Sequence, residues 1–386
     1  MTRGAPWFVT DFLPRWLGRA MMPDGSVIEA LNLAGEAEKL APTTLTQART
    51  VFALSHLYLA TRDDRLRQAA LAVYGFMDGA LRDKDGGYRQ STQNALRRSY
   101  DQSFALLALT TLQRIEPGAV PESRITDLWH FTQTTLTEPA TGALWEDDAM
   151  AATGAVPDAL RAQNPHMHML EATLQALEMT GDPAWLDRAT HLVQCAARHF
   201  IDPATGAIRE FVGPDLAPLA TPKGARREPG HQYEWAWLLQ RYADFGGDAA
   251  ARVMADRMIA FVTARGLRRD GPMAGTPFDA LDATGAQTEA THLLWPLTEA
   301  GKYHAATGAA DRTRAIETLI FKHYFAGGPV PVWCNQLDGA GRILWPAALS
   351  RLIYHVALFV TEGADAGLWQ LEALPDTTHH EEETTP

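Results

Sequence analysis

The feature that most constrains the fold is a set of glycine-centred breaks that recurs along the chain. Gly86, Gly142, Gly206, Gly271 and Gly339 each follow Asp or Thr in a short turn-like segment, and successive members lie 56, 64, 65 and 68 residues apart. A repeat of this length indicates supersecondary units that stack and share one hydrophobic core. At about 64 residues per unit, a chain of 386 residues holds about six units.

A second kind of break, rich in Gly and Asp, separates two helix-length segments inside a unit. These breaks lie at residues 61–64, 180–183, 246–248 and 307–311. Each unit is therefore expected to contain a helix, a turn, a second helix and a hairpin-like connection.

The two helices of a unit differ in their pattern of apolar residues. Residues 98–114 and 232–242 are apolar almost all round and are predicted to be buried, whereas residues 182–200 and 248–265 are amphipathic and are predicted to lie at the surface. Six buried helices inside six surface helices make an all-α (α/α)6 barrel. An open right-handed superhelix is the alternative arrangement. We expect one barrel domain over residues 1–365, strands only in the connections, and an acidic, disordered tail over residues 366–386.

Composition excludes several classes of function. The formal charge of −12 disfavours binding to nucleic acid or to an anionic membrane surface. The two cysteines, Cys195 and Cys334, are too few for a disulfide framework and stand in no metal-binding motif. No stretch reaches 18 apolar residues, and residues 1–25 lack the apolar core of a signal peptide. We expect a cytoplasmic protein, monomeric or homodimeric.

The barrel geometry predicts where chemistry collects. All inner helices of such a barrel run parallel, so their N-terminal ends meet at one mouth. The expected first turns there are rich in polar and aromatic side chains. In chain order they supply Arg49, Tyr100, Asn164 with His168, His231 with Glu234, Trp295 with Glu299, and His355. The fifth inner helix is expected to include Glu289 and His292 as well.

Histidine–glutamate spacing points to acid–base chemistry. His168 and Glu171 are three residues apart, as are His231 and Glu234, which places each pair on one helix face. A carboxylate beside a buried imidazole orients the ring and tunes its basicity near neutral pH. Tryptophan faces such as that of Trp295 suit the C–H side of a sugar ring.

Other interpretations of these residues remain open. His56, His292 and His304 suit ordinary core positions. His166 and His168 alternate along the helix, so at most one should face a pocket. With His231 and Glu234 they are also an alternative metal site, although such a pair chelates best from a strand. A glycoside hydrolase would need two flanking carboxylates, and no such motif stands out.

Four motifs follow one another along the chain: Asn164-Pro-His-Met-His-Met-Leu-Glu-Ala172, Pro229-Gly-His-Gln-Tyr-Glu-Trp-Ala-Trp-Leu-Leu239, Leu294-Trp-Pro-Leu-Thr-Glu-Ala300 and Tyr354-His355. Together they resemble the N-acylglucosamine 2-epimerase superfamily, most closely its D-mannose isomerase branch. The resemblance runs from about Arg49 to His355. It implies an (α/α)6 barrel, in agreement with the repeat count, and a monosaccharide substrate with no metal and no cofactor.

The resemblance implies proton transfer between C1 and C2 of an aldose through a cis-enediol. It assigns His231 and His355 as the acid–base pair, His168 to ring opening, and Glu234 to orienting His231. Arg49 would stabilise the enediolate. The remaining members of the sugar site would be Asn164, Trp295, Glu299 and Tyr100.

The motifs do not separate an aldose–ketose isomerase from a 2-epimerase or from a sulfoquinovose-type isomerase. A non-catalytic sugar- or protein-binding toroid is a further alternative, against which the His–Glu pairs argue. Residues 214–228 are expected to cap the mouth. Lys223, Arg226 and Arg227 in that segment could meet an anionic sugar, or could equally form a solvated loop.

Overall fold

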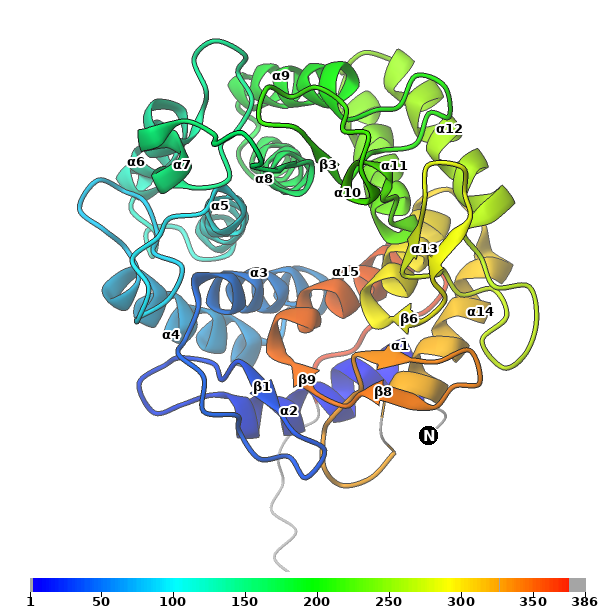
Figure 1. The fold of residues 1–386 in the computed structure, drawn as a ribbon. Helices are drawn as coiled ribbons and strands as arrows, with labels where there is room; N and C mark the ends of the chain where they lie inside the picture. Colours follow the sequence, from blue (N-terminus) through cyan, green and yellow to red (C-terminus); the bar gives the residue numbers. More distant parts are fainter. Residues whose placement is uncertain (1–2, 326, 375–386) are drawn as a thin grey trace, which may run out of the picture.

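The computed structural model describes residues 3–325 and 327–374 and has the predicted architecture, an (α/α)6 barrel (Figure 1). The inner ring consists of α3 (Thr44–Thr61), α5 (Ser99–Ile115), α8 (Asn164–Thr180), α11 (Pro229–Asp244), α13 (Leu294–Ala306) and α15 (Ile353–Asp365). Each inner helix packs against the next, and α15 packs against α3. The ring is therefore closed, and the open superhelix is excluded.

The outer ring covers the inner one. It consists of α4 (Asp64–Ala80), α6 (Glu122–Phe131) continued by η2 (Thr132–Leu136), α9 (Ala184–His199), α12 (Ala250–Arg265), α14 (Ala310–Leu319) continued by η3 (Ile320–Tyr324), and the N-terminal run α1 (Ala5–Trp7), η1 (Phe8–Phe12) and α2 (Leu13–Ala20). Residues 366–374, the described part of the chain after α15, form no helix, and the N-terminal run takes the place of the sixth outer helix. Phe12 packs on Phe325 with ring centroids 4.9 Å apart, which joins the two ends of the ring.

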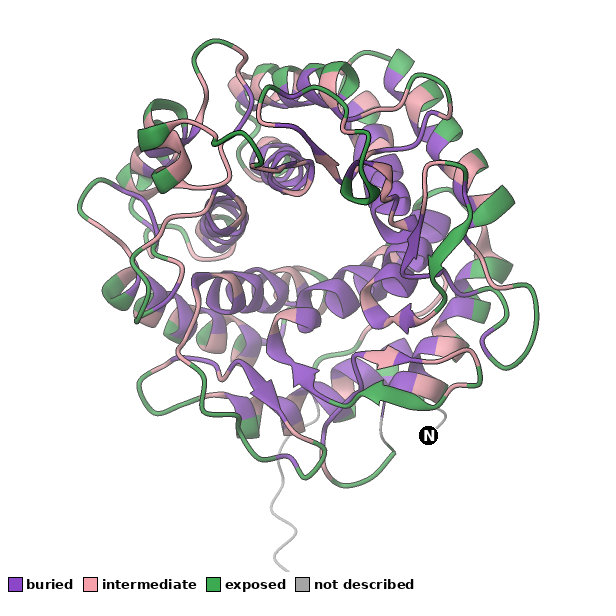
Figure 2. Ribbon diagram, viewed as in Figure 1, coloured by how far each residue is buried: buried purple, intermediate pink, exposed green. Residues whose placement is uncertain are grey.

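Burial follows the two rings (Figure 2). The inner helices are buried on nearly every side, whereas the outer helices bury one face and expose the other. The turns between paired helices use left-handed residues. Gly181, with φ of 73°, ends α8 and donates its N–H to the carbonyl of Leu177 at 2.8 Å, a conformation that costs glycine little.

The glycine-centred connections are hairpins at the mouth. Backbone bridges close them around Gly86, Gly142, Gly206 and Gly271. The structure also explains how the barrel holds them. Gln102, one turn into α5, accepts the N–H of Tyr88 at 2.7 Å and donates to the carbonyl of the same residue at 2.8 Å.

This glutamine clamp recurs in other units. Gln232 in α11 makes the same pair of bonds to the backbone of Ile208, at 2.7 and 3.1 Å. Gln47 in α3 makes it to Val27, at 2.8 and 2.9 Å. Buried backbone groups need partners, and the amide side chain supplies both a donor and an acceptor. These units therefore share a hydrogen-bonding pattern as well as a similar length.

Strands are short and confined to the connections, as predicted. All pairings are antiparallel: β1 (Ala30–Leu31) with β9 (Ala348–Leu349), β2 (Arg161–Ala162) with β3 (Phe211–Val212), β4 (Ala280–Leu281) with β5 (Gln287–Glu289), and β6 (His292–Leu293) with β7 (Gln336–Leu337), which also pairs with β8 (Ile343–Trp345). Short helices α7 (Asp148–Thr153), α10 (Pro222–Ala225) and η4 (Ser350–Leu352) complete the connections. Within the described ranges, no helix combines the length and apolarity needed to cross a membrane.

Two expectations from the sequence are wrong. Glu289 and His292 lie in β5 and β6, so α13 begins only at Leu294. Residues 366–374 do not form a disordered tail, because Trp369 donates its indole N–H to the carbonyl of Val360 at 2.7 Å and the nearby chain packs on the barrel. The acidic residues after 374 lie outside the described residues.

Candidate active site

A cavity of about 240 Å³ opens where the N-terminal ends of the inner helices meet. Every inner helix contributes to its lining, as the parallel arrangement predicts. The lining includes Arg49, Tyr100, Asn164, His168, Glu228, His231, Glu234, Trp295, Asn335, Trp345, Arg351 and His355. The structure therefore brings together every residue that the sequence predicts for the site except Glu299, which lies directly beneath it.

His231 is held by two carboxylates at the start of α11. Its Nδ1 lies 2.7 Å from Oε2 of Glu210 and 3.3 Å from Oε2 of Glu228. Burial lowers the pKa of His231, but the negative charges of Glu210 and Glu228 outweigh it and raise the pKa to about 9. His231 is therefore a cation at neutral pH. Glu234 makes no hydrogen bond to it, so the predicted pairing of these two residues is wrong.

His355 has the opposite charge state. Its Nδ1 lies 2.8 Å from Oε1 of Glu299, and its Nε2 lies 3.4 Å from Nη1 of Arg49. A guanidinium can only donate, so Nε2 carries the lone pair and Nδ1 carries the proton that it donates to Glu299. Burial and then the positive charges of Arg49 and Lys302 hold the pKa of His355 well below 6.5. The ring is neutral, with its basic nitrogen toward the cavity.

The predicted pairing of His168 with Glu171 is confirmed, with Nδ1 and Oε2 3.0 Å apart. The hydroxyl of Tyr354 donates to the other carboxylate oxygen of Glu171. Burial lowers the pKa of His168 to about 4, so this ring is neutral as well.

Beneath the cavity lies a buried group of charges around Lys302. Its Nζ is 2.5 Å from Oε2 of Glu299 and 3.9 Å from the centre of the Trp237 ring. Glu234, close by, has neither carboxylate oxygen hydrogen-bonded within the described structure. Burial and the negative charge of Glu299 raise the pKa of Glu234 well above 4.5. These surroundings favour the neutral carboxylic acid form of Glu234, which lines the cavity and in that form can donate a hydrogen bond.

The remaining lining offers groups that suit a polyhydroxylated ligand. The buried Oδ1 of Asn164 has no protein partner within the described residues. Nη2 of Arg49 donates to the hydroxyl of Tyr100 at 2.8 Å. The Trp295 ring lies between the two histidines, with centroids 4.7 Å from His231 and 5.9 Å from His355. One apolar face thus borders a cavity of hydrogen-bonding groups, as sugar sites require.

The other histidines lie away from the cavity lining. His166 accepts the N–H of Leu144 at Nε2, at 2.9 Å, and bonds the carbonyl of Ala162 through Nδ1 at 3.1 Å. It takes the place of the clamping glutamine in its unit, so the alternative metal site that pairs it with His168 is wrong. His56, His292 and His304 also lie outside the lining.

Among the residues that the structure describes, three groups of one histidine and two carboxylates lie close enough together to hold a cation. They are His168 with Glu171 and Glu234, His231 with Glu210 and Glu228, and His355 with Glu234 and Glu299. In each group, Nδ1 of the histidine already bonds a carboxylate. The positive charges of Arg49, at Nε2 of His355, and of His231 itself disfavour a divalent cation in the cavity.

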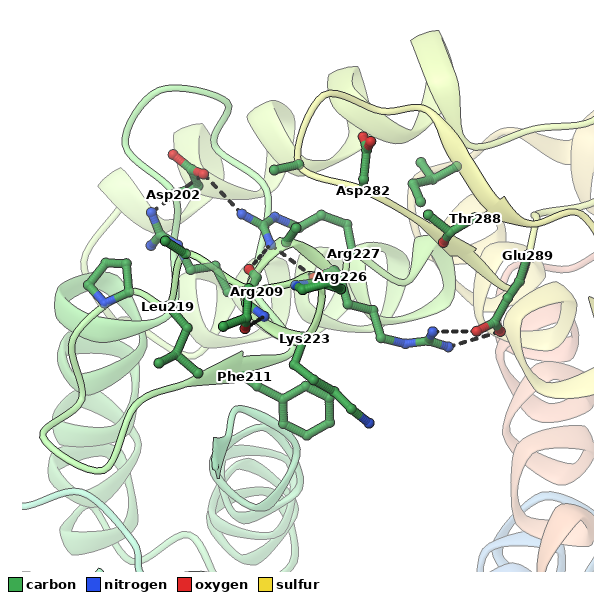
Figure 3. A pocket seen from close by; sticks show the side chains of 18 residues that line it. Asp202, Arg209, Phe211, Leu219, Lys223, Arg226, Arg227, Asp282, Thr288 and Glu289 are labelled. Carbon is green, nitrogen blue, oxygen red and sulfur yellow. Dashed lines mark hydrogen bonds and ion pairs between the residues drawn. The ribbon is translucent and has the colours of Figure 1, made fainter. Parts of the chain in front are cut away.

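The segment before α11 forms a separate, larger cavity at the rim (Figure 3). This cavity, of about 1000 Å³, lies between residues 209–227 and the β4–β5 hairpin. Arg226 and Arg227 are paired with carboxylates there, whereas Lys223 forms no ion pair with a described residue and its Nζ lies 5.8 Å from the centre of the Phe211 ring. Arg227 pairs with Asp202 at 3.0 Å, and Arg226 pairs with Glu289 at 2.5 Å and with Glu228 at 2.7 Å. Arg226 and Arg227 are therefore already paired with carboxylates and are not free to bind an anionic sugar.

Sequence reasoning missed several groups that shape the site. Glu210 and Asn335 come from connections and carry no helix-spacing signal. Lys302 follows Glu299 by three residues on one helix, a spacing that would have indicated the pair. Glu228 precedes the Pro-Gly-His motif directly, and Arg351 precedes Tyr354-His355.

The fold and the cavity define a class of protein: an (α/α)6-barrel enzyme with buried histidines lining a cavity at the mouth formed by its inner helices. The N-acylglucosamine 2-epimerase (GlcNAc 2-epimerase) family profile matches residues 27–358. The chain belongs to that family and is a sugar isomerase or epimerase.

Individual relatives agree with this assignment. The chain is 29% identical to a mannose-6-phosphate isomerase of Rhizobium meliloti (strain 1021), covering 94% of this chain and 96% of the relative. It is 26% identical to a D-mannose isomerase of Thermobifida fusca, covering 70% and 72%. A solved D-mannose isomerase superposes with a TM-score of 0.79 at 17% identity, covering 92% of this chain and 95% of that one. A sugar epimerase from a ruminal bacterium superposes with a TM-score of 0.81, also at 17% identity, covering 94% and 98%.

Proposed function

We propose that this protein is an aldose–ketose isomerase that interconverts D-mannose, or an aldose of similar configuration such as D-lyxose, with the corresponding ketose. The reaction proceeds by proton transfer through a cis-enediol and uses neither a metal nor a cofactor. The observation that carries the proposal is the pair of histidines of opposite charge at one cavity, neutral His355 and protonated His231.

In this proposal His355 is the general base. Its Nε2 lone pair faces the cavity, and Glu299 holds Nδ1 in the required tautomer. The base removes the proton from C2 of the open-chain aldose, and the C2–H electron pair forms the C1–C2 double bond of the enediolate. Arg49, which lies beside Nε2 of His355, stabilises the negative charge that develops on oxygen.

His231 is the complementary acid. As an imidazolium it donates a proton to the C1 oxygen of the enediolate, and the resulting neutral imidazole then takes the proton of the C2 hydroxyl as the ketose carbonyl forms. The proton held on His355 returns to C1, so that C2–H is broken, C1–H is formed and the enzyme is restored. Two titratable groups whose surroundings drive their pKa values apart suit such a division of roles.

The other lining residues bind the sugar and prepare it. Neutral His168 bonds the ring oxygen or the anomeric hydroxyl during ring opening. The unpaired Oδ1 of Asn164 and the carboxylic acid of Glu234 bond sugar hydroxyls. Trp295 covers the apolar face of the sugar, and Tyr100 fixes the guanidinium of Arg49.

The decisive experiment is NMR of D-mannose with the enzyme in deuterated water. We expect D-fructose carrying deuterium at C1. The His355→Ala variant, checked for an unchanged melting temperature, is the matched control and should show neither product nor exchange. The proposal fails if no aldose pair related at C2 is converted and no C2 proton exchanges.

A 2-epimerase is the second candidate, favoured by the presence of two acid–base groups at one cavity. It would return the proton to the opposite face of C2. The same spectra distinguish the two, because epimerisation of mannose gives glucose labelled at C2 instead of fructose.

A further inference from the structure

One arginine at the mouth of the barrel is attracted by the carboxylate of Glu29 but forms no ion pair with it. Arg351 lies in η4, immediately before α15, and is half-buried. Its guanidinium makes no hydrogen bond and no ion pair with any residue that the structure describes. Cations this far removed from water are ordinarily paired. An unpaired arginine in a cavity wall is able to bind an anion.

The neighbours of Arg351 add positive charge. Nη1 of Arg49 lies 3.5 Å from the backbone oxygen of Arg351. The guanidinium groups of Arg49 and Arg98 lie 5.7 and 5.8 Å from the centre of the Tyr100 ring. Arg98 has its own partner, Asp101, at 2.7 Å. Neither Arg49 nor Arg351 forms an ion pair with a residue that the structure describes, so both leave positive charge uncompensated at this edge.

Two carboxylates nearby do not supply the missing partner. Glu29 accepts hydrogen bonds from the backbone N–H of Thr43 at 2.7 Å and from its hydroxyl at 3.0 Å. Glu146 accepts the N–H of Ala162 at 2.6 Å, and burial raises its pKa to about 7. Neither lies within 4.0 Å of the Arg351 guanidinium, so both carboxylates are engaged elsewhere.

The position of Arg351 indicates which end of a bound sugar would lie next to its guanidinium. It lines the reaction cavity and also an adjoining cavity of about 520 Å³. The two cavities share Tyr100, Asn164 and Arg351, whereas His231 and His355 line only the first. A sugar with C1 and C2 at the histidines can therefore direct its far end toward Arg351.

We propose that Arg351, flanked by Arg98, forms an anion subsite that binds a phosphate group on the end of the aldose remote from C1. The substrate class is then an aldose phosphate, for which mannose 6-phosphate is the probe. This inference rests on the proposed function, since it places C1 and C2 between His231 and His355. Arginine suits phosphate because its donors bind two oxygens at once.

The test compares kcat/KM for mannose 6-phosphate with that for mannose. We expect the phosphorylated sugar to be preferred, and Arg351→Met to lower the ratio of the two values about 10- to 100-fold, the range for loss of a charged hydrogen-bonding partner. Arg351→Lys keeps the charge and should retain an intermediate ratio. Lys223→Met is the matched control, because it removes one positive charge from the rim segment outside both cavities. It should leave the ratio unchanged.

A binding measurement separates this inference from the proposed function. Mannose 6-phosphate should raise the melting temperature of the wild-type protein, and less so that of Arg351→Met, whether or not turnover occurs. Inorganic phosphate should compete with mannose in the wild type. An equal ratio in the wild type and Arg351→Met, or equal stabilisation of both by mannose 6-phosphate, overturns the subsite. Loss of C2 exchange with both sugars overturns the proposed function instead.

Discussion

Replacing Glu210 with glutamine should change the charge of His231 while leaving the site otherwise assembled. Oε2 of Glu210 lies 2.7 Å from Nδ1 of His231 and also accepts from Nε2 of Gln163 at 3.1 Å. Its other oxygen accepts the N–H of Glu228 at 3.0 Å. A glutamine keeps the shape and one acceptor but removes the negative charge that most strongly supports the imidazolium.

The size of the effect follows from these contacts. A hydrogen bond to a charged group contributes about 1.5–3 kcal/mol, and each pKa unit corresponds to about 1.4 kcal/mol. The pKa of His231, about 9 in the wild type, should therefore fall by about one to two units in Glu210→Gln. Because His231 must be protonated to act as an acid, activity is present below this pKa and is lost as the pH rises through it.

The assay is the pH profile of kcat/KM for mannose. In the wild type, kcat/KM should stay constant from neutral pH down to well below pH 6.5, because His355 remains neutral over that range. It should fall near pH 9, where His231 loses its proton. In Glu210→Gln the alkaline fall should begin about one to two pH units lower, so that at pH 9 the variant is slower by about 5- to 50-fold. Asp282→Asn, which removes a carboxylate outside the reaction cavity, is the control. An alkaline limb that does not move in Glu210→Gln would refute the assignment of His231 as the acid.

Three further outcomes are expected. His231→Ala and His355→Ala should each abolish solvent-deuterium exchange at C2 with unchanged circular dichroism, and near-normal turnover in either would contradict the acid–base pair. Dialysis against a chelator should leave kcat/KM unchanged, because Arg49 and His231 already supply positive charge in the cavity; activity lost to the chelator and restored by one divalent ion would contradict this. Lys302→Met should lower the free energy of unfolding by about 3–5 kcal/mol, because it leaves the Glu299 carboxylate buried without its ion pair. Lys322→Met, at the surface, is the control and should leave the free energy of unfolding unchanged. Urea denaturation measures both variants.

The fold was largely predictable because its constraints are periodic. The recurring glycines mark hairpins such as those whose backbone groups are held by Gln102 and Gln232, and Gln47 holds the connection before α3 from a similar depth in its inner helix. Where the sequence breaks the pattern, the prediction failed. The polar run containing Glu289 and His292 was assigned to a helix, although Pro296 suits the first turn of a helix and so places the start near Leu294.

The site was predictable only where its contacts are local. Three-residue spacing correctly pairs His168 with Glu171, because both lie on the same face of α8. The same spacing fails for His231 and Glu234. The hairpin of the preceding unit brings Glu210 to Nδ1 of His231, across 21 residues of sequence, and Glu234 turns toward the buried charges instead. A helix pattern indicates which residues share a face, but it does not indicate what the next unit places against that face.

The different charges of His231 and His355 follow from these longer-range contacts. Both rings are buried, and both place Nδ1 within 2.8 Å of a glutamate oxygen, so burial and the nearest partner do not distinguish them. The charged groups beyond that nearest glutamate distinguish the two rings. His231 has Glu228 as an additional carboxylate, whereas the partner of His355, Glu299, is already neutralised by Lys302, and Arg49 stands at its other nitrogen. Lys302 therefore acts on the reaction through Glu299: it keeps that carboxylate from turning His355 into a second cation, and so preserves the one basic nitrogen that the proposed proton transfer from C2 requires.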